Sequence, residues 1–375
     1  MERKLVDNSE LLAEKAVQSG VDGIAQPLTA FFASLMPEAT NVQISNIDTP
    51  PADSGFSAEN YFVDLTWTEG DGPRRARYVV RRQSKAAMFP GRSFSRERRI
   101  QEILSTKTDL PVPGILAYED DPAVLDGRFY VMKYLQGATP PAAAPHDVGM
   151  LAELSEQARR KLWFSGLSQL GAIHRLDAVE LGLDFVSDAA QSGSELAGLL
   201  DYWERHYMQS SNGKPLQLMT DAMAWLRSNE PDEQQASLLW GDARIGNMLF
   251  DDDQNCVGIV DWELASLGNP LQDLAYWTYS DDHFIHIANH GALAGWPTLD
   301  ETIAAYQRAS GSVVDERTLK YYRLVAGYWI VCTLSQLVAI KKRVGQFPAD
   351  LEVTEAAFSP VSFYRSEFES TTSTY

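Results

Sequence analysis

Apolar and polar residues recur with two different periods, and the change from one period to the other divides the chain into two parts. In the first part, helical spacing covers residues 9–36, and a second helix is predicted over 93–106. Period-two runs predict strands over residues 42–48, 60–67, 75–83 and 128–135. The first part therefore predicts a small, strand-rich lobe.

The second part of the chain is mostly helical. Residues 137–147 are rich in Pro and Ala, which is typical of a linker. Helices are predicted over residues 149–175, 195–209, 216–228, 271–279, 298–309 and 315–343. We expect an α+β, bilobal fold in which residues 1–136 form the N-terminal lobe and residues 137–365 form the helical C-terminal lobe. The polar residues 366–375 predict a flexible tail.

One predicted hairpin interrupts the helical part and carries the candidate chemistry. Two apolar runs, "NMLF" and "CVGIV", are joined by the acidic turn "DDDQN". Asn247 begins the first run and Asp261 follows the second, so a hairpin would place their side chains close together. Asp242 precedes Asn247 by five residues. Carboxylate and amide oxygens suit Mg²⁺, which keeps further positions for water and phosphate. Asp242 would then be free to accept a proton.

The spacing of these three residues matches the catalytic layout of protein kinases. There, an Asp is followed five residues later by an Asn, and a metal-binding Asp comes after a hairpin. The alternative is that Asp242 and Asn247 are turn formers and that Asp261 caps a helix. Three such residues in one correct arrangement favour the functional interpretation, which predicts a protein-kinase-like fold.

Several features of the first lobe are candidates for nucleotide binding. Gly55 and Ser57 lie in a small-residue turn that could offer backbone N–H groups to phosphates. Arg81, two residues after Val79, stands where the kinase strand motif has its phosphate-binding Lys. Glu97, in the helix after that strand, is the candidate ion-pair partner. The alternatives are an ordinary hairpin turn and a solvated helix face.

The chain resembles the aminoglycoside phosphotransferase family, and within it the kinase-like domains of certain acyl-CoA dehydrogenase family members. The resemblance rests on "WGDARIGNMLF" and "GIVDWELASLGNPLQDLAYW", supported by "RYVVRRQ", "SRERRIQEIL", "FYVMKYLQG" and "LGAIHRLD". It implies a kinase-like fold that binds ATP, with adenine against the hinge at Met132 and Tyr134. It also implies that Asp242 is the catalytic base, that Asn247 and Asp261 bind Mg²⁺, and that Asp273 holds the loop.

The sequence departs from the family pattern at Trp240, where His-Gly-Asp is more usual. We expect this change to make the packing under the loop apolar without removing catalysis. His174 lies on a helix face, and a buried, hydrogen-bonded core histidine is favoured over a catalytic one. The alternative for the whole chain is a catalytically inactive, nucleotide-binding pseudokinase, for which Arg81 and Trp240 are the arguments.

Composition limits the partners and the compartment. The net charge of −19 disfavours nucleic acid and anionic membranes as partners. Two cysteines in apolar runs predict buried free thiols, and the charged N-terminus predicts no signal peptide, so we expect a cytoplasmic protein. The apolar run over residues 324–340 predicts a buried core helix and not a membrane span.

The expected partner is a small molecule with a hydroxyl group: an aminoglycoside-like compound, an amino alcohol or a hydroxyacyl metabolite. Residues 202–207 and 279–290 are expected to line its pocket. Asp281 and Asp282 could face a cationic ligand, or they could cap a helix or lie in solvent. The oligomeric state is left open.

Overall fold

The computed structural model describes residues 23–50, 58–70, 72–84, 88–141, 145–232, 236–288 and 290–375. The chain divides into two compact units, each with its own core. The first unit contains Met1–Lys85 and Ile115–Tyr134, and the second contains Ala86–Gly114 and Leu135–Tyr375. Strands dominate the first and helices the second, which agrees with the predicted α+β class.

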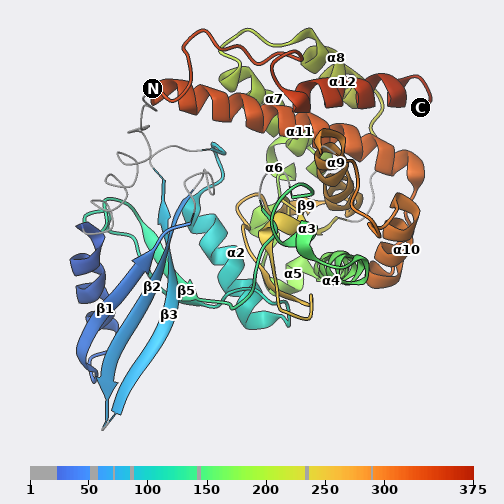
Figure 1. Cartoon of the computed structure of the whole chain (residues 1–375). Helices are drawn as coiled ribbons and strands as arrows, with labels where there is room; N and C mark the ends of the chain where they lie inside the picture. Colours follow the sequence, from blue (N-terminus) through green and yellow to red (C-terminus); the bar gives the residue numbers. More distant parts are fainter. Residues whose placement is uncertain are drawn as a thin grey trace, which may run out of the picture. The chain divides into compact units, whose positions relative to one another are not determined.

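The first unit is built on a five-stranded antiparallel sheet with the strand order β1-β2-β3-β5-β4 (Figure 1). Its strands are β1 (Thr40–Asp48), β2 (Ala58–Glu69), β3 (Gly72–Gln83), β4 (Ile115–Glu119) and β5 (Phe129–Lys133). A helix over Gly23–Leu35 packs Leu28 and Phe32 against buried sheet residues such as Val63. The earlier residues of the predicted helix over 9–36 lie outside the described residues. The edge strand β4 was not predicted.

The second unit is organised around α11 (Glu316–Arg343), which packs against α7, α8, α9 and α12. The helices longer than one turn in the rest of this unit are α2 (Phe94–Lys107), α4 (Glu156–His174), α7 (Glu195–Ser210), α8 (Gln217–Ser228), α9 (Leu271–Ile287), α10 (Leu299–Ser310) and α12 (Ser359–Thr372). Helix α11 is long and apolar enough to cross a membrane, but 56% of its most apolar window is buried in the structure. This burial agrees with the predicted core helix. Cys256 and Cys332 are free and buried, as expected.

Helix α2 belongs to the second unit, whereas the sequence placed it in the first lobe. Its buried residues Ile100 and Leu104 are part of the hydrophobic core of the helical unit. Gln101 Nε2 also donates to the backbone oxygen of Pro113 at 2.8 Å. Packing on the helical core therefore determines the position of α2, although strands precede and follow it in the sequence.

The structure has a helix over most of residues 366–375, where the sequence predicted a flexible tail. Helix α12 continues to Thr372, and its residues Val361 and Tyr364 are buried. Glu367 forms an ion pair with Arg323 of α11 at 3.0 Å. The last ten residues are mostly polar, and the apolar anchors of the helix lie just before them.

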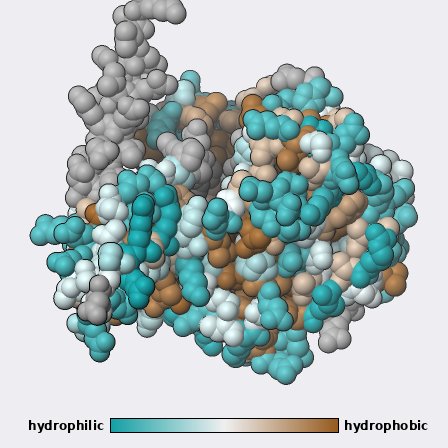
Figure 2. All heavy atoms as spheres, turned by 60° about the horizontal axis from the view of Figure 1, so that its bottom comes forward, coloured by the Kyte–Doolittle hydropathy of each residue, from teal (hydrophilic) through white to brown (hydrophobic). Residues whose placement is uncertain are grey.

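The face drawn in Figure 2 is largely hydrophilic, with hydrophobic side chains gathered in smaller groups between the polar ones. This surface fits a chain with 51 acidic and 32 basic residues. The hydrophobic residues are concentrated in the two cores, and the larger core contains buried Trp240, Trp262 and Trp277.

Candidate active site

Four short strands in the helical unit position the candidate catalytic residues. Strands β6 (Ser237–Leu239) and β9 (Ser266–Gly268) pair antiparallel, and β7 (Met248–Phe250) pairs antiparallel with β8 (Cys256–Ile259). Asp242 lies in the connection from β6 to β7, and Asp261 lies in the connection from β8 to β9.

The predicted hairpin is present as β7–β8, with a register shift between Leu249 and Phe250. Met248 lies opposite Ile259, and the N–H of Val260 donates to the backbone oxygen of Asn247 at 3.0 Å. Asp261 therefore follows directly after the residue that is bonded to Asn247. The hairpin therefore places the backbones of Asn247 and Asp261 next to each other.

Asp242 is held by its neighbours in the same loop. Asn247 Nδ2 donates to Asp242 Oδ2 at 2.7 Å and to the backbone oxygen of Asp242 at 3.1 Å. Arg244 Nε donates to Asp242 Oδ1 at 3.3 Å. Since both carboxylate oxygens accept hydrogen bonds, the carboxylate has a defined orientation while its side chain stays 18% exposed. A residue that must take a proton from a ligand needs both properties.

The charges around Asp242 affect the pKa values of two neighbouring groups. Burial lowers the pKa of Arg244, but nearby Asp242, Tyr276 and Asp261 raise it more, so the net shift is upward. Burial, followed by the charge of Asp242, raises the pKa of Tyr276 well above its ordinary value. At neutral pH the site therefore holds a permanent guanidinium and a neutral phenol beside the carboxylate.

Two residues in the loops of the candidate site have left-handed backbone conformations. Gly241 has φ 89°, and a Cβ atom there would lie 2.4 Å from the backbone oxygen of Leu264. Asp261 has φ 65°, which is uncommon for a residue other than glycine. Such conformations persist only where surrounding contacts enforce them, and they are concentrated at functional sites.

Asp273 confirms its predicted role as a structural acid. It is fully buried at the start of α9, where it accepts from the N–H of Trp240 at 2.7 Å and from the N–H of Gly241 at 3.0 Å. His174 Nε2 lies 3.1 Å from the same carboxylate, and His174 Nδ1 lies 2.6 Å from the Tyr306 hydroxyl. His174 is thus the buried, hydrogen-bonded core histidine that was predicted.

Trp240 is fully buried, and its ring packs near that of Trp262 with centroids 5.9 Å apart. Its indole Nε1 also donates to the backbone oxygen of Val260 at 3.0 Å. The packing under the loop is therefore apolar, as expected. In addition, this side chain links the loop of Asp242 to the strand end before Asp261.

The candidate nucleotide-binding residues lie in both units. Gly55 and Ser57 fall outside the described residues. Arg81 is buried on β3, where it pairs in register with Asn60 and Tyr130. Met132 is buried on β5, and Tyr134 follows that strand with 37% of its surface exposed.

Glu97 is buried on α2 in the second unit, so the alternative of a solvated helix face was wrong for this residue. Its pairing with Arg81 stays a prediction, because the two residues belong to different units. The nucleotide-binding roles of Gly55, Ser57, Met132 and Tyr134 also stay predictions.

Asp281 and Asp282 do not present free carboxylates to a ligand. Asp281 is buried and lies 3.0 Å from His146 Nε2, and it accepts from Trp296 Nε1 at 2.7 Å. Asp282 pairs with Arg323 at 2.9 Å. Neither a cationic ligand nor bulk solvent is therefore the main partner of Asp281.

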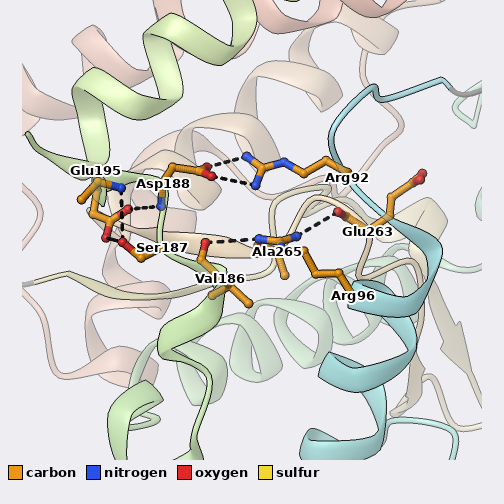
Figure 3. Close-up of polar contacts among 9 residues, drawn as sticks. Arg92, Arg96, Val186, Ser187, Asp188, Glu195, Glu263 and Ala265 are labelled. Carbon is orange, nitrogen blue, oxygen red and sulfur yellow. Dashed lines mark hydrogen bonds and ion pairs between the residues drawn. The ribbon is translucent and has the colours of Figure 1, made fainter. Parts of the chain in front are cut away.

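Arg96 was not predicted from the sequence as a functional residue, and its guanidinium ties two loop segments together. Its side chain donates to the backbone oxygens of Ala265 at 2.6 Å, Val186 at 3.2 Å and Glu263 at 3.4 Å (Figure 3). Burial lowers the pKa of Arg96 to about 10, so it remains charged at neutral pH. Arg96 thereby fixes the segment that follows Asp261.

The donor set can be compared with what Mg²⁺ requires. Asn247 uses its amide N–H₂ group on Asp242, and its Oδ1 has no hydrogen-bond partner among the residues that the structure describes. The carboxylate of Asp261 and the amide oxygen of Asn247 suit a hard cation that keeps water and phosphate ligands. No group of three or more His, Cys, Asp or Glu side chains in the described ranges forms a complete protein-only metal site.

Comparisons with known proteins identify the family of the chain. The model of a family described as "Phosphotransferase enzyme family" matches residues 48–302. The Arabidopsis thaliana protein named "Probable acyl-CoA dehydrogenase IBR3" is 28% identical over 289 residues, which are 72% of this chain and 33% of that protein. Human acyl-CoA dehydrogenase family member 11 is 27% identical over 242 residues, covering 62% of this chain and 30% of that protein. The chain thus spans about a third of the length of these relatives.

Solved structures share the fold. A protein from Ralstonia eutropha JMP134, described as an aminoglycoside phosphotransferase, aligns with a TM-score of 0.67 at 20% identity, covering 93% of this chain and 98% of that one. The aminoglycoside phosphotransferase APH(4)-Ia, in a complex with ADP and hygromycin B, aligns with a TM-score of 0.55 at 14% identity, covering 91% and 98%. These likenesses confirm the predicted α+β, protein-kinase-like fold.

Proposed function

Since the chain belongs to the phosphotransferase enzyme family, we propose that it transfers the γ-phosphoryl group of ATP to a hydroxyl group of a small molecule, with Mg²⁺ as cofactor. The observation that carries this proposal is the hydrogen bond of 2.7 Å from Asn247 to Asp242, with Asp261 placed beside Asn247 by the β7–β8 hairpin. This arrangement puts a candidate base next to candidate cation ligands.

Asp242 is the proposed general base. The proton of the acceptor's hydroxyl group moves to the Asp242 carboxylate while the acceptor oxygen forms a bond to the γ-phosphorus. The bond between the γ-phosphorus and the bridging oxygen of ATP breaks, and ADP leaves with its electron pair. Arg244 and Asn247 hold this carboxylate in one orientation before the acceptor arrives. General-base catalysis of this kind contributes roughly 10²- to 10⁴-fold.

Asn247 and Asp261 are the proposed ligands of the cation. When bound, Mg²⁺ would neutralise the charge of the phosphates. The free Oδ1 of Asn247 and the enforced conformation of Asp261 support this assignment. In the first unit, Gly55, Ser57, Arg81, Met132 and Tyr134 are the proposed contacts of the nucleotide, with Glu97 as the proposed partner of Arg81.

The acceptor is proposed to be a hydroxylated small molecule, and aminoglycosides, amino alcohols and hydroxyacyl compounds are the classes to screen. An inactive nucleotide-binding scaffold remains the alternative that the same experiments would detect. Trp240 was one of the two arguments for an inactive scaffold. This argument is weaker because the Trp240 indole supports the loop of Asp242.

The proposal is tested by measuring ADP release from Mg-ATP across these three acceptor classes. In Asp242→Asn, turnover should fall roughly 10²- to 10⁴-fold with Mg-ATP binding retained. In Asp261→Asn, turnover should fall and calorimetry should show weaker Mg-ATP binding. Asp253→Asn is the matched control, because it makes the same change at an exposed position in the hairpin turn. Undiminished turnover in Asp242→Asn would refute the proposed base, and Mg-ATP binding without turnover on any acceptor would favour the scaffold.

A further inference from the structure

A cavity of about 420 Å³ lies in the helical unit, and its lining does not include Asp242, Asn247 or Asp261. It is lined by the segment before α2, by residues near Asp188, and by α7. The lining residues used below are Pro90, Arg92, Asp188, Tyr202, Arg205 and His206. The sequence predicted that residues 202–207 line a ligand pocket, and the cavity has this stretch on one wall.

One wall of the cavity is fixed by an ion pair. Arg92 donates from both terminal nitrogens to Asp188, at 2.9 and 2.5 Å (Figure 3). The N–H of Asp188 donates in turn to Glu195 at 2.8 Å, and the Arg92 guanidinium lies 4.6 Å from the centroid of the Tyr202 ring. Arg92 Nε remains buried without a hydrogen-bond partner among the described residues. Several contacts therefore hold this wall in place, and Arg92 Nε still has an N–H group to donate.

The second cation of the cavity is not neutralised by an ion pair. Arg205 is exposed and forms no hydrogen bond or ion pair with any residue that the structure describes. Asp201, the acidic residue one helical turn before it, is held by Arg227 at 2.7 Å and by Ser192 at 2.6 Å. With Arg92 paired to Asp188, Arg205 leaves the lining with an excess positive charge in a chain of net charge −19.

His206 adds an unsatisfied polar group. Its side chain is 3% exposed, and its ring is stacked with the rings of Phe89 and Tyr202, with centroids 6.1 and 6.0 Å away. Nε2 has no hydrogen-bond partner in the described part of the chain. Burial lowers the pKa of His206 to about 4, so at neutral pH the imidazole is uncharged and carries one N–H. Buried polar groups are nearly always hydrogen-bonded, so this nitrogen points to a ligand or water in the cavity.

We propose that this cavity binds the oxyanion of a small acidic molecule, a carboxylate or a phosphate. Arg205 supplies the unpaired charge, and His206 and Arg92 Nε supply N–H donors. Tyr202 and Pro90 offer apolar surface to the rest of the molecule. Charge-assisted hydrogen bonds of this kind are the stronger ones in proteins. We expect the cavity not to bind cations. The proposal is about equilibrium binding of the anion and does not depend on phosphoryl transfer.

The cavity is also connected to the segment that follows Asp261. Val186, next to the cavity-lining Ser187, accepts a hydrogen bond from Arg96 at 3.2 Å, and the same guanidinium holds Ala265 at 2.6 Å. A ligand in the cavity therefore lies against a wall that shares its support with this loop.

The test is isothermal titration calorimetry of the full chain with inorganic phosphate and with succinate at constant ionic strength. Succinamide is the uncharged counterpart of succinate. We expect saturable binding of at least one anion and none of succinamide. Arg205→Gln should weaken anion binding roughly ten- to hundredfold. Arg308→Gln, which makes the same change at an exposed arginine outside the cavity, should leave it unchanged.

A second variant protects the test against misfolding. His206→Phe keeps an aromatic ring between Phe89 and Tyr202 but removes the N–H, so anion binding should weaken while the melting temperature stays close to that of the wild type. Binding of phosphate alone would indicate a phosphate-bearing ligand, and binding of succinate alone a carboxylic acid. Absence of binding, or equal binding in the wild type and Arg205→Gln, would overturn the proposal. Anion binding is measured without ATP turnover, so a protein that releases no ADP could still bind the anion. The two proposals can therefore fail independently of each other.

Discussion

Replacing Asp273 by Ala tests the idea that one buried carboxylate determines the geometry of the catalytic loop. The carboxylate is fully buried and makes three contacts: the N–H of Trp240 at 2.7 Å, the N–H of Gly241 at 3.0 Å and His174 Nε2 at 3.1 Å. A buried donor left without its acceptor costs about 1–3 kcal/mol. Because neighbouring effects are not additive, we expect Asp273→Ala to lower the free energy of unfolding by about 3–5 kcal/mol.

Such a loss is a large share of the stability of an ordinary protein, which is about 5–15 kcal/mol. Turnover should also fall, because Asp242 directly follows the two bonded amides and a displacement of about 1 Å can cost roughly 10²-fold. Unfolding in urea, followed by tryptophan fluorescence, gives the free energy, and ADP release gives the turnover.

Tyr306→Phe is the matched control for this experiment. It removes only the hydroxyl that lies 2.6 Å from His174 Nδ1, at the far end of the same hydrogen-bonded chain. We expect a loss of about 1 kcal/mol and nearly unchanged turnover. The reasoning would be refuted if Asp273→Ala unfolded within about 1 kcal/mol of the wild type, or if it lost no more than the control.

Two further predictions concern backbone strain and pH. Gly241→Ala should lower the free energy of unfolding by about 3 kcal/mol or more and abolish turnover, because the new Cβ would lie 2.4 Å from the backbone oxygen of Leu264. Gly345→Ala is the control: it has φ 77° but open space around it, and it should lower the free energy of unfolding by only about 1–2 kcal/mol in a melting experiment. Burial lowers the pKa values of His206 and His283 from 6.5 to about 4. Between these two pH values the unfolded state binds more protons than the folded state, so the free energy of unfolding should fall as the pH drops from about 6.5 to 4. Replacing both histidines by Phe should flatten this dependence in urea titrations at pH 4.5 and 7, and an unchanged slope would argue against it.

The local elements were predictable because their signals lie in neighbouring residues. Ser93 is the first residue of the helix predicted over 93–106, and in the structure its hydroxyl caps α2 by accepting from the N–H of Arg96 at 3.2 Å. The β7–β8 hairpin followed in the same way from two apolar runs and an acidic turn. Local spacing was therefore enough to bring Asn247 and Asp261 together.

The contacts that were missed join segments far apart in the sequence. Strands β6 and β9 have three residues each and pair across an intervening hairpin, so neither shows an alternation long enough to detect. Arg96 bonds to backbone oxygens, which any residue provides, so its partners leave no trace in the sequence. The cavity lined by Arg92 and Arg205 depends on the same kind of long-range packing.

The indole of Trp240 occupies the position where the family more often has a histidine, and it donates to Val260. An imidazole in this place could gain a proton near neutrality, whereas an indole has no proton to gain or lose over the physiological range. The bridge between the two loops should therefore be equally intact in mildly acidic and mildly alkaline solution. Any acid-induced loss of turnover would then have to originate in other groups of the enzyme.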